Sequence, residues 1–240
     1  MIVAAAFLPH PLLLLPEYAS LADPGAELRA RCRSAVAEAL AAAPDSIVVI
    51  TGVPRDVSTI DSRSPLGMRV AQELLAAEAA DDAVSGLPGE PEATGKAGAS
   101  AEQGARLEVI TVPFDADEGE VAEAGARLRA RAQDARTVVL VMGDGSARRS
   151  EKAPGHLDER AFAMDQVIAD ALAAGDPGGL SGLDAGLAEQ LLIAGRAAWQ
   201  ALAAGLVGPP DRARAEVSDP FGVLYHVAVW EWDQQEQDLG

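Results

Sequence analysis

Two short segments contain the residues whose chemistry is most informative. In the first, His10 stands between Pro9 and Pro11, and the two prolines stiffen the backbone around its imidazole. An imidazole held in this way is suited to act in a cleft as a metal ligand or as a proton acceptor. Alternatively, His10 only ends a strand and hydrogen-bonds to the backbone. The residues around His10 leave both interpretations open.

The second segment, 143–149, reads Gly-Asp-Gly-Ser-Ala-Arg-Arg. It predicts Asp144 and Ser146 as catalytic groups, and Arg148 and Arg149 as substrate-binding groups that grip a carboxylate or phosphate through charge-assisted hydrogen bonds. It is neither a P-loop nor a dinucleotide fingerprint, because the Lys-Ser/Thr pair and the glycine spacing are missing. The alternative is a tight turn in which Asp144 pairs locally with one of the two arginines.

Four further residues could carry chemistry or serve the core. His156 follows a Pro-Gly turn and is expected on the surface, where Asp158 caps the next helix. His226 lies within an apolar run and is expected to be a hydrogen-bonded histidine of the core or sheet face. Trp199 is predicted either to bind substrate from beneath the site or to anchor the core. Cys32, the only cysteine, excludes an internal disulfide and is expected to be buried and inert.

Alternating apolar and amphipathic segments must position these groups. Continuous β-branched runs predict strands that are covered on both faces, and apolar stripes predict helices between them. The alternation indicates an α/β fold with a layered, largely parallel or mixed central sheet flanked by helices. In such folds reactive loops gather beyond the carboxyl ends of the strands, which would bring His10 and 143–149 together. The predicted strands are 2–8, 46–51, 107–112, 137–142 and 222–230, and the predicted helices 26–43, 66–79, 118–132, 159–174 and 184–204.

Composition outlines the domain organisation. A chain of 240 residues is long enough for one substantial core, and we expect a single domain over 1–232. The segment 81–105 is rich in Gly, Ala, Ser, Pro and Glu and predicts a flexible surface insertion. We expect 205–215 to form a second loop, and 233–240 to form a polar tail.

The charge balance restricts the partners. Acidic residues outnumber basic ones by 37 to 19, giving a net charge of -18, which disfavours nucleic acid as a partner. We expect a small-molecule or anionic ligand instead, because of the two arginines in 143–149. The apolar start 2–16 lacks a basic flank and is interrupted by prolines, so we expect neither a signal peptide nor a membrane span, and a cytoplasmic protein. The Ala-rich helices are compatible with a homo-oligomer.

Taken in order along the chain, five short motifs resemble the LigB-like superfamily of class III extradiol ring-cleavage dioxygenases. The resemblance is to an Ala-rich bacterial branch and extends over nearly the whole chain. It is also compatible with an accessory subunit that needs a separate catalytic subunit. The motifs lie at 7–13, 141–148, 154–158, 195–200 and 225–230.

The resemblance implies a particular metal site. Dioxygenases of this family hold a non-haem Fe(II) with two histidines and a carboxylate, and His10 matches the first of these ligands. The second histidine belongs in 51–56, which contains none, and Ala147 stands where the family has its acid/base histidine. The carboxylate ligand has no clear match, although Glu189 lies upstream of its position.

Two hypotheses follow from the resemblance. The first is an oxidoreductase that acts on a small aromatic or acidic substrate through Fe(II), with His10 as ligand, Asp144 as ligand or general base, and Arg148 or Arg149 as the clamp. If Asp56 or Asp144 completed the ligand set, the site would favour Mg²⁺ or Mn²⁺. The alternative is a non-catalytic binding or scaffold protein without metal, whose pocket holds an anion or a protein partner.

Overall fold

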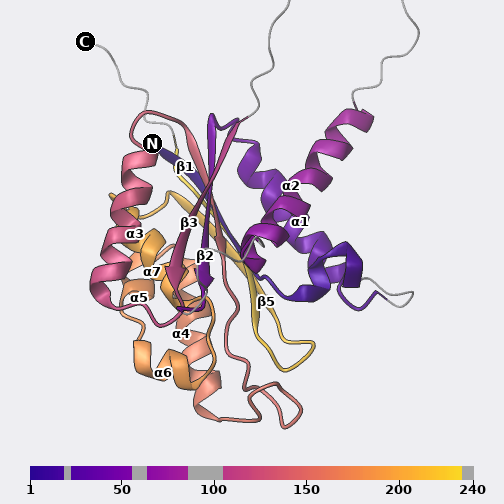
Figure 1. Ribbon diagram of the computed structural model, residues 1–240, viewed down its shortest axis with the longest axis vertical. Coiled ribbons are helices and arrows are strands. Elements are labelled where there is room, and N and C mark those ends of the chain that lie inside the picture. Colours follow the sequence, from indigo (N-terminus) through magenta and orange to yellow (C-terminus); the bar gives the residue numbers. More distant parts are fainter. Residues whose placement is uncertain (19–22, 56–63, 86–104, 234–240) are drawn as a thin grey trace, which may run out of the picture.

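The computed structural model describes residues 1–18, 23–55, 64–85 and 105–233, with 81–85 described by their backbone alone. The chain folds into a six-stranded mixed sheet with helices on both faces, as the α/β prediction requires (Figure 1). The strand order is β3-β2-β4-β1-β6-β5; the first four strands are parallel, β6 is antiparallel to β1, and β5 is antiparallel to β6. The strands are β1 (Ile2–Leu8), β2 (Ser46–Val53), β3 (Arg106–Pro113), β4 (Thr137–Met142), β5 (Arg212–Ser218) and β6 (Tyr225–Glu231).

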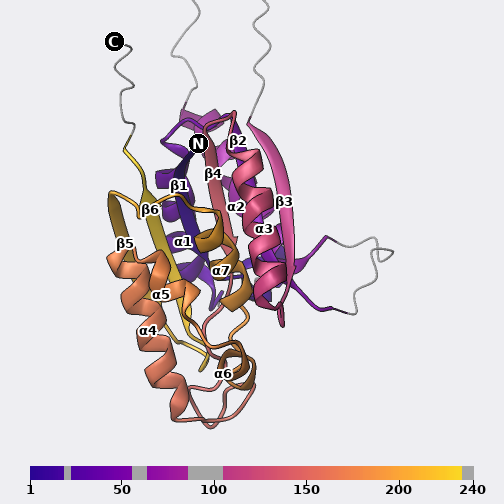
Figure 2. The same ribbon diagram turned by 90° about the vertical axis from the view of Figure 1, so that its left-hand side faces the viewer.

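The helices form two layers around this sheet (Figure 2). Helices α1 and α2 pack on one face, and α3, α4 and α7 pack on the other. Two short 3-10 helices, η1 and η2, follow β1. The bounds are η1 (Leu12–Leu14), η2 (Pro16–Tyr18), α1 (Ala26–Leu40), α2 (Leu66–Ser85), α3 (Glu118–Arg131), α4 (Arg160–Ala174), α5 (Pro177–Ser181), α6 (Ala185–Gln190) and α7 (Arg196–Gly205).

The core consists of two apolar layers separated by the sheet. Strands β1 and β4 lie inside the sheet, and nearly every residue in them is buried. Successive side chains of a strand point to opposite faces, so each central strand contributes to both layers. This explains why their sequences are continuously apolar.

Local signals set several helix ends. Helix α3 begins with a capping box in which Asp117 and Glu120 each accept a hydrogen bond from the other's backbone amide. Helix α4 ends at Gly175, whose φ of 64° lies in the left-handed region that glycine adopts without strain.

Three predicted elements need correction. The helix expected over 184–204 is two helices, α6 and α7, separated by a turn in which Leu192 has a φ of 56°. The loop expected over 205–215 contains the start of β5, an edge strand whose polar, partly exposed sequence lacks the apolar run of a buried strand. The strand expected over 222–230 begins only at Tyr225, because Gly222 forms a turn with a φ of 73°.

The predicted insertion is also shorter than expected at its start. Helix α2 continues to Ser85, so 81–85 are helical rather than part of a loop. The remainder of the predicted insertion, 86–104, and the tail 234–240 lie outside the described residues. In the part of the chain that the structure describes, no helix is both long enough and apolar enough to cross a membrane.

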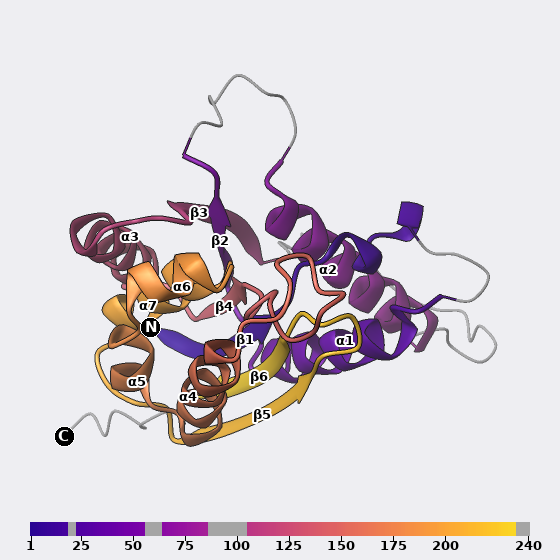
Figure 3. The ribbon, with the colours of Figure 1, turned by 90° about the horizontal axis from the view of Figure 1, so that it is seen from below.

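The connections that leave β1 and β4 diverge. The chain runs from β1 to α1 on one face, and from β4 to α4 on the other. Adjacent parallel strands with this property form a topological switch point, where open α/β sheets place their ligand sites. Figure 3 looks onto this carboxyl edge of β1 and β4.

Candidate functional site at the carboxyl edge of β1 and β4

His10 and Asp144 meet at the switch point. Leu8 of β1 pairs with Met142 of β4, and each of the two site residues follows two positions later. The His10 backbone amide donates to Asp144 Oδ1 at 2.9 Å, and His10 Nδ1 lies 3.6 Å from the same oxygen. His10 is buried, whereas the Asp144 side chain is 18% exposed. The structure therefore confirms that His10 and the segment 143–149 come together, as expected from the carboxyl ends of parallel strands.

The Asp144 carboxylate determines the charge state of this pair. Burial by itself lowers the pKa of His10, because a charged imidazole loses solvation. The attraction of the nearby Asp144 carboxylate outweighs that loss, so the pKa of His10 lies above its ordinary value. His10 is thus a buried imidazole that gains a proton more readily than a free histidine.

Close backbone contacts hold the loop after β4 in place. Gly143 donates to the Leu8 carbonyl at 2.9 Å, and the amide of Gly195 donates to the Asp144 carbonyl at 2.9 Å. A Cβ on Gly143 would lie 2.3 Å from Gly195 Cα and 3.1 Å from Trp199 Nε1, so only glycine permits this approach. The start of α7 is thereby fixed against the end of β4.

Trp199 and His226 form a second buried group beside this loop. The indole and imidazole rings pack edge to face, with centroids 5.7 Å apart. Both side chains are almost fully buried, yet Trp199 Nε1 and both ring nitrogens of His226 have no hydrogen-bond partner among the described residues. The prediction of a hydrogen-bonded His226 is therefore wrong. Buried polar atoms without partners are rare in proteins, and each calls for a structural or functional reason.

The charge of Asp144 also acts on neighbours beyond His10. Burial, and then Asp144, raise the pKa of Tyr225 to about 12, and the same two causes raise the pKa of Cys32 to about 12. Burial lowers the pKa of His226 to about 4, against the opposing attraction of Asp144. At neutral pH the site therefore combines a phenol, a thiol and a neutral imidazole around one carboxylate. Cys32 is buried, as the sequence predicted.

Alternation along β6 divides these groups between the two faces. Tyr225 belongs to the layer covered by α1 and α2, and it shares that layer with Cys32. His226 points the other way and packs on Trp199 of α7. The backbone of β6 therefore separates Tyr225 from His226, although the two residues are adjacent in the sequence.

Ser146 and Arg149 belong to a buried network rather than to the His10 pair. The backbone amide of Ser146 donates to Asp165 Oδ1 at 2.9 Å, and its hydroxyl donates to Asp165 Oδ2. Arg149 donates to Asp165 at 3.0 Å and to Asp219 at 2.9 Å, with its guanidinium over the ring of Phe162. The local turn in which Asp144 pairs with Arg149 is thus not formed, and two carboxylates already engage the guanidinium predicted as a clamp.

Arg148 lies on the outer part of the same loop. Its half-buried side chain packs against Gly155, and its Nε is buried without a partner among the described residues. His156 is exposed, as expected from its turn. The Asp158 carboxylate accepts a hydrogen bond from the Arg160 amide at 3.0 Å, but the N-cap residue of α4 is Glu159, so the predicted cap position is wrong by one residue.

The described residues do not fit the iron centre that the family resemblance implies. At the end of β2, where the second histidine belongs, Arg55 pairs with Asp115 and Glu120. Asp56 lies outside the described residues. Within the described ranges, no three His, Cys, Asp or Glu side chains are grouped so that they could hold one metal ion. The Fe(II) triad needs three such donors, and the same shortage applies to Mg²⁺ or Mn²⁺.

Sequence reasoning missed Asp165 and Tyr225 at this edge, and it assigned His226 to the core or sheet face rather than to the site. Asp165 lies inside α4 and is 1% exposed, on the same buried face of the helix as Ala161 and Ile168. Tyr225 and His226 were part of an apolar run, and only the pairing of β6 with β1 brings them to the end of β1. A charged residue among the apolar positions of α4 was the available signal for Asp165.

Comparisons with known proteins assign no function to the chain. No family profile and no curated protein matches it. Among solved structures, the chain is similar to the uncharacterized protein JW3007 from Escherichia coli K12. The identity is 14% and the TM-score 0.44, over 95% of this chain and 98% of that chain.

Proposed function

We propose that this chain is a LigB-like protein that binds a small phenolic or acidic molecule at the switch point, with His10 and Asp144 as its proton-handling pair. The proposal rests mainly on the contact between these two residues, which lie 134 positions apart in the sequence and meet beyond the carboxyl ends of β1 and β4. In this proposal the activity does not depend on the iron centre of ring-cleaving relatives. We further propose a cytoplasmic location, in keeping with one buried, unpaired cysteine.

The geometry suggests how the pair would act. With Nδ1 facing Asp144, the imidazole is oriented so that Nε2 meets the ligand. A phenol would donate its proton to the neutral ring, and a carboxylate would accept a hydrogen bond from the protonated ring. Asp144 would stabilise the imidazolium in either case, and the raised pKa of His10 supports this role. The same steps serve binding or general acid–base catalysis.

Iron-dependent ring cleavage is the second candidate function. It is favoured by the position of His10 directly after β1, where the resembling family has its first iron ligand. This candidate requires two further ligands that the described residues do not supply.

A binding experiment in the presence of a chelator tests the proposal. The probe is 3,4-dihydroxybenzoate, which carries both a catechol and a carboxylate, and the measurement is isothermal titration calorimetry with the full chain. We expect wild type to bind, and His10→Gln to bind about tenfold more weakly, because a charge-assisted hydrogen bond is lost. His156→Asn is the matched control, since it removes an exposed histidine and tolerates the φ of 57° found there.

Two outcomes would contradict the proposal. The first is equal binding by wild type and His10→Gln. The second is binding only after anaerobic Fe(II) loading, together with stoichiometric iron that His10→Ala loses, which would establish the iron enzyme instead.

A further inference from the structure

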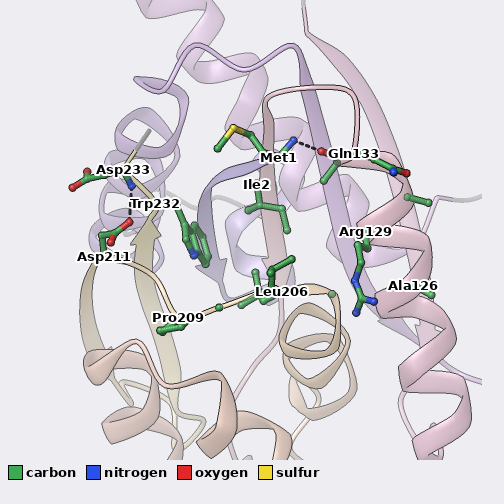
Figure 4. A pocket seen from close by; sticks show the side chains of 15 residues that line it. Met1, Ile2, Ala126, Arg129, Gln133, Leu206, Pro209, Asp211, Trp232 and Asp233 are labelled. Atoms are coloured by element: carbon green, nitrogen blue, oxygen red, sulfur yellow. Dashed lines mark hydrogen bonds between the residues drawn. The ribbon is translucent and has the colours of Figure 1, made fainter. Parts of the chain in front are cut away.

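A cavity of about 1090 Å³ lies at the opposite, amino edge of the parallel strands. It is bounded by the start of β1, the end of α3, the segment after α7 and the residues that follow β6 (Figure 4). A volume of this size accommodates a small organic molecule. None of the residues of the switch-point site lines it.

Apolar side chains form the middle of this amino-edge cavity. Ile2, Leu206 and Trp232 lie around it, with Pro209 close to the tryptophan side (Figure 4). Val207, on the same segment as Leu206, is 97% exposed. Such surface favours an apolar ligand body, because contact with it removes apolar area from water.

The two ends of the cavity differ in charge. Asp211 and Asp233 lie at one end, and Arg129 lies on the other side, on α3 (Figure 4). Arg212 pairs with Asp233, and the Asp233 amide donates to Asp211. Arg129 donates to the Ala204 carbonyl, and in the part of the chain that the structure describes it has no carboxylate partner. Arg129 therefore offers the cavity a guanidinium that no acidic side chain of the described residues neutralises.

We propose that the amino-edge cavity binds a small molecule with an apolar body and a single carboxylate, and that Arg129 receives the carboxylate. The acidic residues at the far end repel a carboxylate placed there, so the ligand has one preferred orientation. A second copy of this chain is a poorer occupant, because a net charge of -18 opposes self-association. The inference is independent of the function proposed above, since the two sites lie at opposite edges of the sheet.

Calorimetry with octanoate as the probe tests this site, with 1-octanol as the uncharged analogue. We expect wild type to bind both, and Arg129→Gln to lose about tenfold in affinity for octanoate but not for octanol. Ala126→Glu should also weaken octanoate binding, because Ala126 lines the cavity three positions before Arg129 and a glutamate there would pair with the guanidinium.

Ala122→Glu is the matched control for Ala126→Glu. It adds the same charge to the exposed surface of α3 at a position that does not line the cavity, and it should bind octanoate like wild type. Three results would overturn the proposal: no binding of octanoate at millimolar concentration, equal octanoate binding by Arg129→Gln, or equal weakening by the two glutamate variants. A wild-type dimer that Ala126→Glu dissociates in sedimentation would also overturn it, by making the cavity an interface between copies.

Discussion

The two edges of the sheet differ in how far their polar side chains are buried. At the carboxyl edge, ring nitrogens of His10, His226 and Trp199 are shielded from solvent. At the amino edge, Arg212 pairs with Glu231, and more than half of the arginine side chain is exposed. Helix α7 runs between the two edges: it begins beside Gly143 and ends at the residues that line the amino-edge cavity. Burial therefore shifts the pKa values of Tyr225 and His226 strongly at the carboxyl edge, whereas the Arg212–Glu231 pair at the amino edge lies largely in solvent. The difference indicates that proton chemistry belongs to the carboxyl edge, and that the amino edge offers mainly apolar surface.

We expect the largest change in the free energy of unfolding when a buried carboxylate is removed, in comparison with a carboxylate at the amino edge. Asp165→Ala would leave Arg149 without one of its two partners and Ser146 without the carboxylate that accepts from its amide and hydroxyl. We expect a loss of about 4 kcal/mol in the free energy of unfolding, measured by urea titration followed by circular dichroism. Glu231→Gln at the amino edge breaks a solvent-screened pair with Arg212 and should change the free energy of unfolding far less than Asp165→Ala does. Similar costs for the two variants would remove the contrast between the edges.

The second prediction concerns the pH dependence that His226 imposes. Its pKa is lowered from 6.5 to about 4 in the folded protein, so the unfolded chain takes up the proton first as the pH falls. Stability should decrease between pH 6.5 and 4 by about 3 kcal/mol from this residue. His226→Phe keeps a ring against Trp199 and should remove this part of the decrease in urea titrations across that range, whereas His156→Asn should retain it. Parallel curves for wild type and His226→Phe would show that His226 is not held neutral.

The smallest expected effect is a change in the pKa of His10, which tests the role of Asp144. Asp144→Asn removes the charge that raises the pKa of His10 and leaves burial, which lowers it. We expect the pKa of His10 to fall below its value in the wild type, and NMR of the imidazole carbon-bound protons measures this shift. The pKa of His226 should fall as well, because Asp144 also raises it. Arg129→Gln at the amino edge should change neither pKa. An unchanged pKa of His10 in Asp144→Asn would contradict the pairing of His10 with Asp144.

The central strands were predictable for a simple reason. The runs 2–8 and 137–142 are continuously apolar, and the structure has strands with these same bounds. Buried central strands must be apolar on both faces, so composition alone identifies them. The edge strand β5 was missed because its side chains are mostly polar and only partly buried, and its identity as a strand comes from pairing with β6.

Some site residues could likewise be selected from the sequence, and others could not. His10 and Asp144 could be selected from the sequence, since each follows a buried strand within a Pro- or Gly-containing loop. The partners of Arg149 could not be selected, because Asp165 and Asp219 lie 16 and 70 positions away and reach it through α4 and the turn before β6. Sequence position does not indicate which of several acidic residues a long, flexible arginine will meet.

The sequence by itself determined the α/β class, the five strands other than β5 and the two loops at the switch point, because these depend on local patterns of apolar and turn-forming residues. Only the tertiary structure decided that His226 stays neutral beside Trp199, and that an apolar cavity lined by Arg129 forms at the opposite edge. Both features are made by segments more than 20 positions apart in the chain. Their properties follow from burial and neighbouring charge, which no single segment of the sequence contains.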